Sequence, residues 1–351
     1  MKRTVFAGLG LLSLTLSTLG ISSPVSAQTV SVVMSGLDNP RGLAFGPKGA
    51  LYVAEAGRGG DGPSIVLPGP GGEQSYGPTG ALTRLLRGKQ ERVATGLPSF
   101  AGADGAATGP HDVAFQGQIA YVTVGFGADP ALRAGFGSVG ARFGTLIKVP
   151  KNGKWRVVSD IAAYEATVNP AGGPVDSNPY GLLVRPGATI VTDAGANALL
   201  QVKANGNIST LAVFPARPVR LTDAVPTAVV IGPDKAYYVS ELTGVPFAEG
   251  AANVYRVVPG ATPQVFRDGF KTIIDIAFGP DGSLYVLQHA TGEIFFGGPG
   301  QVIRVAPDGT RQVVISDLVR PTSLAIDRDG TLYVTNNGVS VGTGEVLRIQ
   351  P

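Results

Sequence analysis

One phrase recurs six times along this chain of 351 residues, and it constrains the fold more than any other feature. Its clearest copy spans Asn39–Glu55, with the sequence NPRGLAFGPKGALYVAE. The copies open at Pro40, Pro110, Pro179, Pro226, Ile273 and Pro321. Each copy contains two short runs of β-forming residues joined by a Gly/Pro/Asp turn, so each predicts a β-hairpin.

Two further strands follow each predicted hairpin. The third carries a basic or polar residue at the same place in every copy: Arg84, Lys148, Gln201, Arg256, Arg304 and Arg348. A fourth, outer strand follows most copies, but the last copy ends at Ile349 without one, whereas Val30–Val33 has no repeat of its own. We therefore predict an all-β, six-bladed β-propeller with NHL-like blades, whose last blade is closed by the N-terminal strand.

The first residues predict a secretory signal peptide. Lys2 and Arg3 precede an apolar stretch, Val5–Leu19, and a small-residue cleavage site ends at Ala27. The stretch is short for a membrane span of about 20 residues, and no other segment is suitable. We expect residues 1–27 to be removed, residues 28–351 to form one propeller domain, and the mature chain to be periplasmic or extracellular, without a membrane span.

Composition narrows the function classes. The chain has no cysteine and two histidines, which excludes disulfides, thiolate metal sites and a cysteine nucleophile. Loss of Lys2 and Arg3 would lower the 28 basic residues to 26, against 25 acidic ones. Because the mature chain is nearly neutral and lacks a cluster of basic residues, we expect no nucleic-acid partner. We also expect a monomer.

The copies are unevenly spaced, with steps of 70 and 69 residues followed by 47, 47 and 48. Much of the extra length lies between the second and third strands of blades one and two, from Glu55 to Arg84 and from Val124 to Lys148. In a propeller, these loops share a face with the loops that lead into the innermost strands. Long loops on a rigid scaffold commonly carry function, so we predict a binding face there; a passive insertion is the alternative.

Polar residues close the second strand in five of the six copies: Glu55, Asp193, Glu241, Gln288 and Asn336. Their oxygens could contact a ligand or a cation, since oxygen donors suit calcium. Alternatively, they satisfy backbone N–H groups near the strand end, and their recurrence in most blades favours this structural role.

Two histidines are predicted to lie on the same face. His111 and Asp112 break the repeat where other copies carry Arg41-Gly and Tyr180-Gly, and His289 follows the second strand of blade five. The candidate ligand-binding residues are Arg41, Glu55, His111, Asp112, Tyr180, Asp193, Glu241, His289 and Asn336. No catalytic, cofactor-binding or metal-binding residue can be assigned from the sequence.

Two motif matches lack the context that their chemistry needs. Gly57–Gly62 fits G-x-G-x-x-G, but a proline and more glycines follow instead of a helix that could receive a pyrophosphate. Gly338–Gly342 fits G-x-S-x-G, but a strand follows it instead of a helix. We therefore expect neither a dinucleotide site nor a serine nucleophile.

Several phrases resemble the ScyD/ScyE family, secreted propellers associated with the scytonemin pigment cluster of cyanobacteria. They are SNPYG at 177–181, TDAGAN at 192–197, VPT at 225–227 and ELTGVPF at 241–247. The resemblance covers nearly all of the mature chain and implies an extracytoplasmic role around a secondary metabolite. The family offers no established catalytic residues. The segment 37–45 also resembles soluble quinone-dependent sugar dehydrogenases, whose basic cluster is not evident here.

Two functions follow from these features. The first is a binding or scaffold protein whose loop face holds a small aromatic metabolite, a glycan or a protein partner. The second is a calcium- or quinone-dependent enzyme, a lactonase-like hydrolase or a sugar or alcohol oxidoreductase. In it Asp193, Glu241 and Asn336 would hold the ion as a Lewis acid, with His111 as the base. The sequence leaves open whether the chain is an enzyme.

Overall fold

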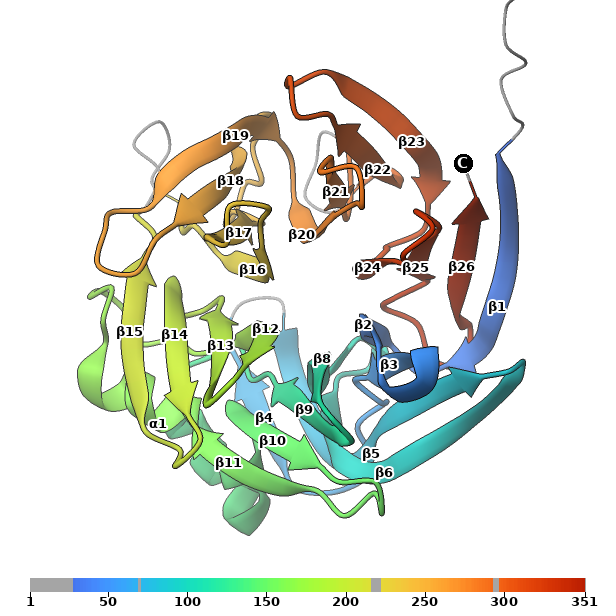
Figure 1. Ribbon diagram of the computed structural model, residues 1–351. Helices are drawn as coiled ribbons and strands as arrows, with labels where there is room; N and C mark the ends of the chain where they lie inside the picture. The colour runs from blue at the N-terminus through green and yellow to red at the C-terminus, as the bar shows by residue number, and fades with distance from the viewer. Residues whose placement is uncertain (1–27, 69–70, 216–221, 293–296, 351) are drawn as a thin grey trace, which may run out of the picture.

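Six β-sheets form a closed ring in the computed structural model, which describes residues 28–68, 71–215, 222–292 and 297–350 (Figure 1). Five sheets have four strands, and the sheet of blade one has additional ones. The predicted six-bladed β-propeller is confirmed. The predicted signal peptide, residues 1–27, lies outside the described residues.

Each blade contributes one strand to each of four concentric layers. The innermost strands are β2 (Pro40–Phe45), β8 (Pro110–Gln116), β12 (Pro179–Arg185), β16 (Pro226–Ile231), β20 (Ile273–Phe278) and β24 (Ser323–Ile326). The second strands are β3 (Leu51–Glu55), β9 (Ile119–Val124), β13 (Ala188–Asp193), β17 (Tyr237–Glu241), β21 (Leu284–Gln288) and β25 (Leu332–Asn336). The third strands are β5 (Gly72–Leu86), β10 (Thr145–Val149), β14 (Ala198–Lys203), β18 (Ala252–Val257), β22 (Gly300–Val305) and β26 (Gly344–Gln350). The outermost strands are β6 (Lys89–Ala101), β11 (Arg156–Asp160), β15 (Ile208–Val213), β19 (Gln264–Phe270), β23 (Arg311–Leu318) and β1 (Thr29–Leu37).

The two ends of the described chain meet in the last blade. Strand β1 pairs antiparallel with β26, with Thr29 opposite Gln350 and Leu37 opposite Gly344. Figure 1 shows β1, in blue, outside β26, in red. The predicted closure by the N-terminal strand is therefore confirmed, and β1 covers the outer edge of β26.

The hydrophobic core is divided among the boundaries between blades. Every second strand has a valine two residues before its last residue, and each of these valines has no exposed surface. They are Val53, Val122, Val191, Val239, Val286 and Val334, and each belongs to a different hydrophobic cluster. Burying a side chain of this size contributes about 1.5–3 kcal/mol, so the most regular part of the repeat stabilises all six boundaries.

The long loops of blades one and two pack against each other. The first contains β4 (Ser64–Leu67), which pairs with β5, and the second contains the 3₁₀ segment η3 (Pro130–Arg142). Phe136, from η3, lies 5.4 Å from Phe100 and 5.3 Å from Phe143 between ring centroids. These insertions are therefore ordered around an aromatic cluster of their own.

Besides β4 and η3, two further elements were not predicted. Strand β7 (Ala107–Thr108) extends the sheet of blade one, and helix α1 (Ile161–Val168) lies between β11 and β12. The side chain of Asp160 caps α1 by accepting from the backbone N–H of Ala163. In the part of the chain that the structure describes, no helix has the length and apolar character needed to cross a membrane.

Candidate functional site

The propeller has two faces with different connections. The loop face carries the loops between second and third strands and the loops that lead into the innermost strands. The turn face carries the turns between first and second strands and between third and fourth strands. The discarded motif at Gly57–Gly62 lies on the loop face and is followed by β4, not by a helix, as expected.

Four of the candidate residues meet where the central channel opens on the loop face. Arg41, His111 and Tyr180 hold the same position in the innermost strands of blades one to three. The rings of His111 and Tyr180 lie 4.9 Å apart, and the charge of Arg41 acts on both histidines, His111 and His289. Arg41 itself donates to the carbonyls of Gly338 and Ala107, each at 2.8 Å.

Both histidines are neutral around pH 7. Nδ1 of His111 lies 3.2 Å from the carbonyl oxygen of Pro179, and Nδ1 of His289 lies 2.8 Å from that of Pro321. A carbonyl oxygen can only accept a hydrogen bond, so the ring nitrogen that faces it, Nδ1, must carry the proton and donate. Burial, together with the charge of Arg41, lowers the pKa of His111 to about 3 and that of His289 to about 4. A base with so low a pKa is inefficient near neutrality, which argues against a general-base role for His111 in this conformation.

Asp112 ties blade two to blade three. Its Oδ2 accepts from the backbone N–H of Leu182 in β12 at 2.8 Å. Asp275 holds the same position in blade five and accepts from the N–H of Leu324 in β24 at 2.8 Å. Burial raises the pKa of Asp112 to about 8, with a contribution from the charge of Asp275. Asp275 was not predicted as a site residue, although its place in the fifth copy matches that of Asp112.

The channel between the innermost strands has almost no free volume. Its cavity measures about 10 Å³ and is lined by Gly42, His111, Asp112, Tyr180, Gly181, Thr227, Ala228, Ile274, Asp275, Thr322 and Ser323. This is about the room that one water molecule needs. The channel therefore does not admit a small-molecule ligand in this conformation.

The polar residues that end the second strands bond to backbone groups of their own blades. Glu55 accepts from the N–H of Asp38 at 2.7 Å, Asp193 from that of Asn178 at 2.6 Å, and Asn336 from that of Val319 at 2.7 Å. Oε1 of Glu241 accepts from the N–H of Asn253 at 2.9 Å. The amide of Gln288 donates to the carbonyl of Lys271 at 2.7 Å. This geometry favours the structural role for the set.

The described residues contain no group of three or more His, Cys, Asp or Glu side chains arranged to hold a metal ion. Asp193, Glu241 and Asn336, the residues considered for calcium, end the second strands of blades three, four and six and each has a backbone partner. Their part in cation binding stays a prediction that the geometry does not favour.

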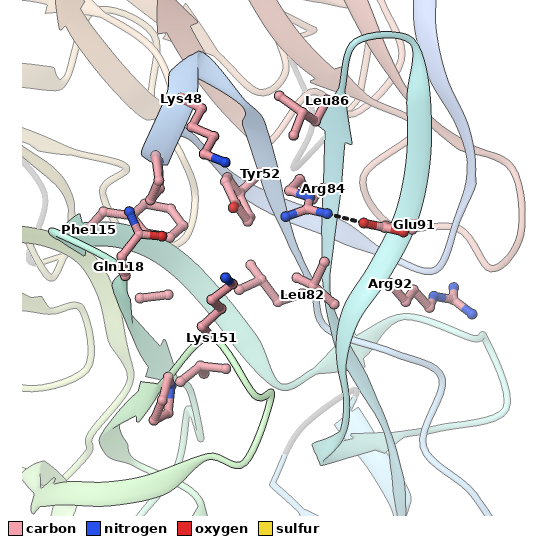
Figure 2. A pocket seen from close by; sticks show the side chains of 15 residues that line it. Lys48, Tyr52, Leu82, Arg84, Leu86, Glu91, Arg92, Phe115, Gln118 and Lys151 are labelled. Atoms are coloured by element: carbon pink, nitrogen blue, oxygen red, sulfur yellow. Dashed lines mark hydrogen bonds and ion pairs between the residues drawn. The ribbon is translucent and has the colours of Figure 1, made fainter.

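A groove of about 640 Å³ lies between blades one and two on the turn face (Figure 2). Its lining comes from turns and strands of both blades: Pro47, Lys48, Tyr52, Leu82, Arg84, Leu86, Glu91, Arg92, Val93, Phe115, Gln118, Ala120, Val149, Pro150 and Lys151. The rings of Tyr52 and Phe115 lie 4.5 Å apart. Figure 2 shows the amino groups of Lys48 and Lys151 pointing toward Tyr52.

The charge of the groove departs from the repeat. In blades four and five, an aspartate of the first turn binds the arginine of the third strand: Asp234 with Arg256 and Asp281 with Arg304, both at 2.6 Å. Blade one has Lys48 at that turn position, and its third-strand arginine, Arg84, pairs with Glu91 instead. Arg92 points away from the groove and binds Asp38 and Glu55 (Figure 2). Three basic groups therefore face a single carboxylate among the lining residues.

The corresponding groove between blades four and five is smaller, at about 220 Å³. There Phe266 packs on Tyr238 with ring centroids 4.8 Å apart, whereas blade one has Val93 on the matching outer strand. The larger groove was not predicted from the sequence, because its lining residues come from six strands and from the turns that connect them. The sequence signal that points to the larger groove is Lys48, which stands where blades four and five have Asp234 and Asp281.

Comparison with known proteins identifies the fold. No family model and no curated protein matches the chain. Among solved structures, a soluble aldose sugar dehydrogenase of Escherichia coli has a TM-score of 0.56 at 15% identity, covering 92% of this chain and 99% of its own. A glucose dehydrogenase has a TM-score of 0.55 at 15% identity, with coverages of 92% and 99%. A streptogramin B lyase has a TM-score of 0.51 at 12% identity, with coverages of 92% and 97%. Identities this low show a shared β-propeller fold alone.

Proposed function

We propose that this chain is a secreted, periplasmic or extracellular binding protein that holds a small aromatic anion in the groove between blades one and two. The observation that carries the proposal is Lys48, which stands where blades four and five have Asp234 and Asp281. Arg84 therefore lacks the turn carboxylate that neutralises Arg256 and Arg304. A secondary metabolite handled outside the cytoplasm, as the ScyD/ScyE resemblance implies, fits this chemistry.

The groove suits such a ligand in size and in lining. About 640 Å³ lies within the range of about 300–1,000 Å³ that is usual for small-molecule sites. The rings of Tyr52 and Phe115 offer contacts to an aromatic ligand, worth about 0.5–1.5 kcal/mol each. The ammonium groups of Lys48 and Lys151 point toward Tyr52 within the same groove (Figure 2), where they can bind an acidic substituent.

The test is a fluorescence titration of the mature protein with the aromatic sulfonate 8-anilinonaphthalene-1-sulfonate. The variant Lys48→Asp restores the turn residue of blades four and five, and we expect it to weaken binding about tenfold, which corresponds to ~1.4 kcal/mol. Binding to the unaltered protein should weaken as salt is added, because salt screens exposed charges.

The matched control is Lys235→Asp, which makes the same change in the first turn of blade four. Lys48 and Lys235 both have positive φ, 63° and 66°, so the backbone demand on the new residue is similar. Equal affinity in Lys48→Asp and Lys235→Asp would mean that the dye does not bind in this groove, and the proposal would be abandoned.

The second candidate is the calcium- or quinone-dependent enzyme, and it rests on the convergence of Arg41, His111, Tyr180 and His289 on the loop face. Native mass spectrometry of the protein purified from its own source separates the two candidates. We expect a monomeric polypeptide that begins at Gln28 and carries no excess mass. An excess that matches calcium or a quinone would favour the enzyme.

A further inference from the structure

A second pocket, of about 300 Å³, lies on the loop face above blade three. Its walls are α1 with the loop that follows it, the turn between β13 and β14, and the segment that leads into β16. The lining residues are Gly127, Glu165, Ala171, Gly172, Pro174, Asp176, Asn178, Ala194, Gly195, Ala196, Asn197, Asp223 and Val225. All its ionisable residues are acidic, and none of the lining residues is Lys, Arg or His.

Two of these carboxyl groups have oxygens without a donor. Glu165 is 2% exposed, and its Oε2 has no hydrogen-bond partner among the described residues. Oδ1 of Asp176 is also buried and has no partner within the same described set. A buried acceptor without a donor costs about 1–3 kcal/mol, and native structures rarely keep one without a reason.

Asp193, at the end of β13 nearby, provides an internal comparison. It is fully buried too, but it accepts from the hydroxyl of Ser177 at 2.7 Å and from the N–H groups of Asn178 at 2.6 Å and Ala196 at 3.2 Å. The loop thus provides donors for Asp193, whereas Oε2 of Glu165 and Oδ1 of Asp176 receive none. A ligand that brings N–H donors would satisfy both.

The electrostatics of the pocket also favour a cation. Burial and the charge of Asp193 raise the pKa of Glu165 to about 7 and that of Asp176 to about 6, and Asp223 adds to the effect on Asp176. Nearby carboxylates therefore repel one another, and a positive charge among them would relieve that repulsion. Cation binding near pH 7 would then release protons.

We propose that this pocket binds an organic cation with several N–H donors, a guanidinium or primary ammonium group. A bare metal ion fits less well. In the described parts of the chain, no three acidic, histidine or cysteine side chains, those of this pocket included, are arranged to hold a metal ion. A guanidinium has five N–H donors in a planar fork and can reach two separate acceptors at once. The cation is either a small molecule or an arginine side chain of a protein partner.

The experiment is isothermal titration calorimetry of the mature protein with agmatine and, separately, with the peptide Gly-Arg-Gly blocked at both ends. We expect Glu165→Gln to weaken binding at least tenfold, because it removes the charge and keeps the shape. Asp176→Asn should weaken binding as well, and it keeps the test decisive if Glu165→Gln fails to fold. Heats measured in buffers of different ionisation enthalpy should show proton release at pH 7.

The control is Glu249→Gln, whose side chain is 79% exposed and lies outside this lining. Binding of agmatine identifies a small-molecule source, whereas binding of the peptide alone identifies a protein side chain. The proposal would be overturned if neither ligand binds at concentrations up to ~10 mM, or if both pocket variants bind with the affinity of the unaltered protein. It would also be overturned if calcium at millimolar concentration displaces agmatine. The dye titration of the groove is independent of all these outcomes.

Discussion

At the third position of each repeat, the side chain decides how neighbouring blades meet. The residues there are Gly42, Asp112, Gly181, Ala228, Asp275 and Ser323. Asp112, Asp275 and Ser323 each accept from a backbone N–H of the next blade. Gly42 faces Asp112 so closely that a Cβ would lie 2.3 Å from Oδ1, so the aspartate fits only because its neighbour is glycine.

The burial of Asp112 makes stability depend on pH. Its pKa in the folded protein, about 8, lies above the value of about 3.9 expected in the unfolded chain. The folded state therefore binds the proton more tightly, and this stabilisation is present at low pH and lost as pH rises toward 8. Between pH 5 and 8, we expect urea unfolding to show a fall in stability that is ~3.5 kcal/mol larger for the unaltered protein than for Asp112→Asn.

Asp329→Asn, in an exposed turn, is the control for this measurement and should keep the slope of the unaltered protein. If the free energy of unfolding falls with pH equally steeply in Asp112→Asn and in the control, Asp112 does not titrate in this range.

Most site residues that were predicted from the sequence lie within the repeated phrase, whereas those that were missed include residues outside it. Arg41, His111 and Tyr180 hold one position of the repeat, so the register places them around one channel mouth. Lys151 and Glu165 lie outside the repeated phrase, in a turn and in an unpredicted helix, and only folding brings them to their pockets. The register of the repeat therefore predicts which residues lie at equivalent positions in the six blades. It does not predict which side chains enclose a cavity.

Strand β1 shows the same division at the scale of elements. Its place was predictable because the last repeat lacked an outer strand, whereas η3 and α1 were missed. The segment of η3 is rich in glycine, which weakens any helical pattern, although Asp129 and Pro130 form a recognisable helix start. Tertiary packing of Phe136 against Phe100 then orders a segment whose own preference is weak.

The stabilising part of β1 is its inward face. Met34 is 2% exposed, whereas Val32 is 55% exposed on the same strand. We expect Met34→Ala to lower the free energy of unfolding by about 2–5 kcal/mol, because it leaves a cavity in the cluster between blades six and one. Val32→Ala should change it by less than ~0.5 kcal/mol. Urea denaturation measures both; similar losses would mean that β1 is held by backbone pairing rather than by packing.

For the whole molecule, the fold was predictable and the binding sites were not. Six copies of one phrase specify six similar sheets, and a ring is the arrangement that leaves no sheet face uncovered. The groove of blades one and two depends instead on single departures, such as Val93 where blade four has Phe266. Such departures have no period, so their effect emerges only when neighbouring blades are packed together.

The pairing of β1 with β26 also sets an order of events during synthesis. A chain that is made from its N-terminus presents β1 before any other strand of the propeller, but β26, the strand with which it pairs, is made after all the others. Blades one to five can each form from neighbouring segments, whereas the sixth must wait for the whole chain. Until then, β1 is an unpaired strand in a crowded compartment, and a chaperone that shields such strands would have to hold this segment longer than any other.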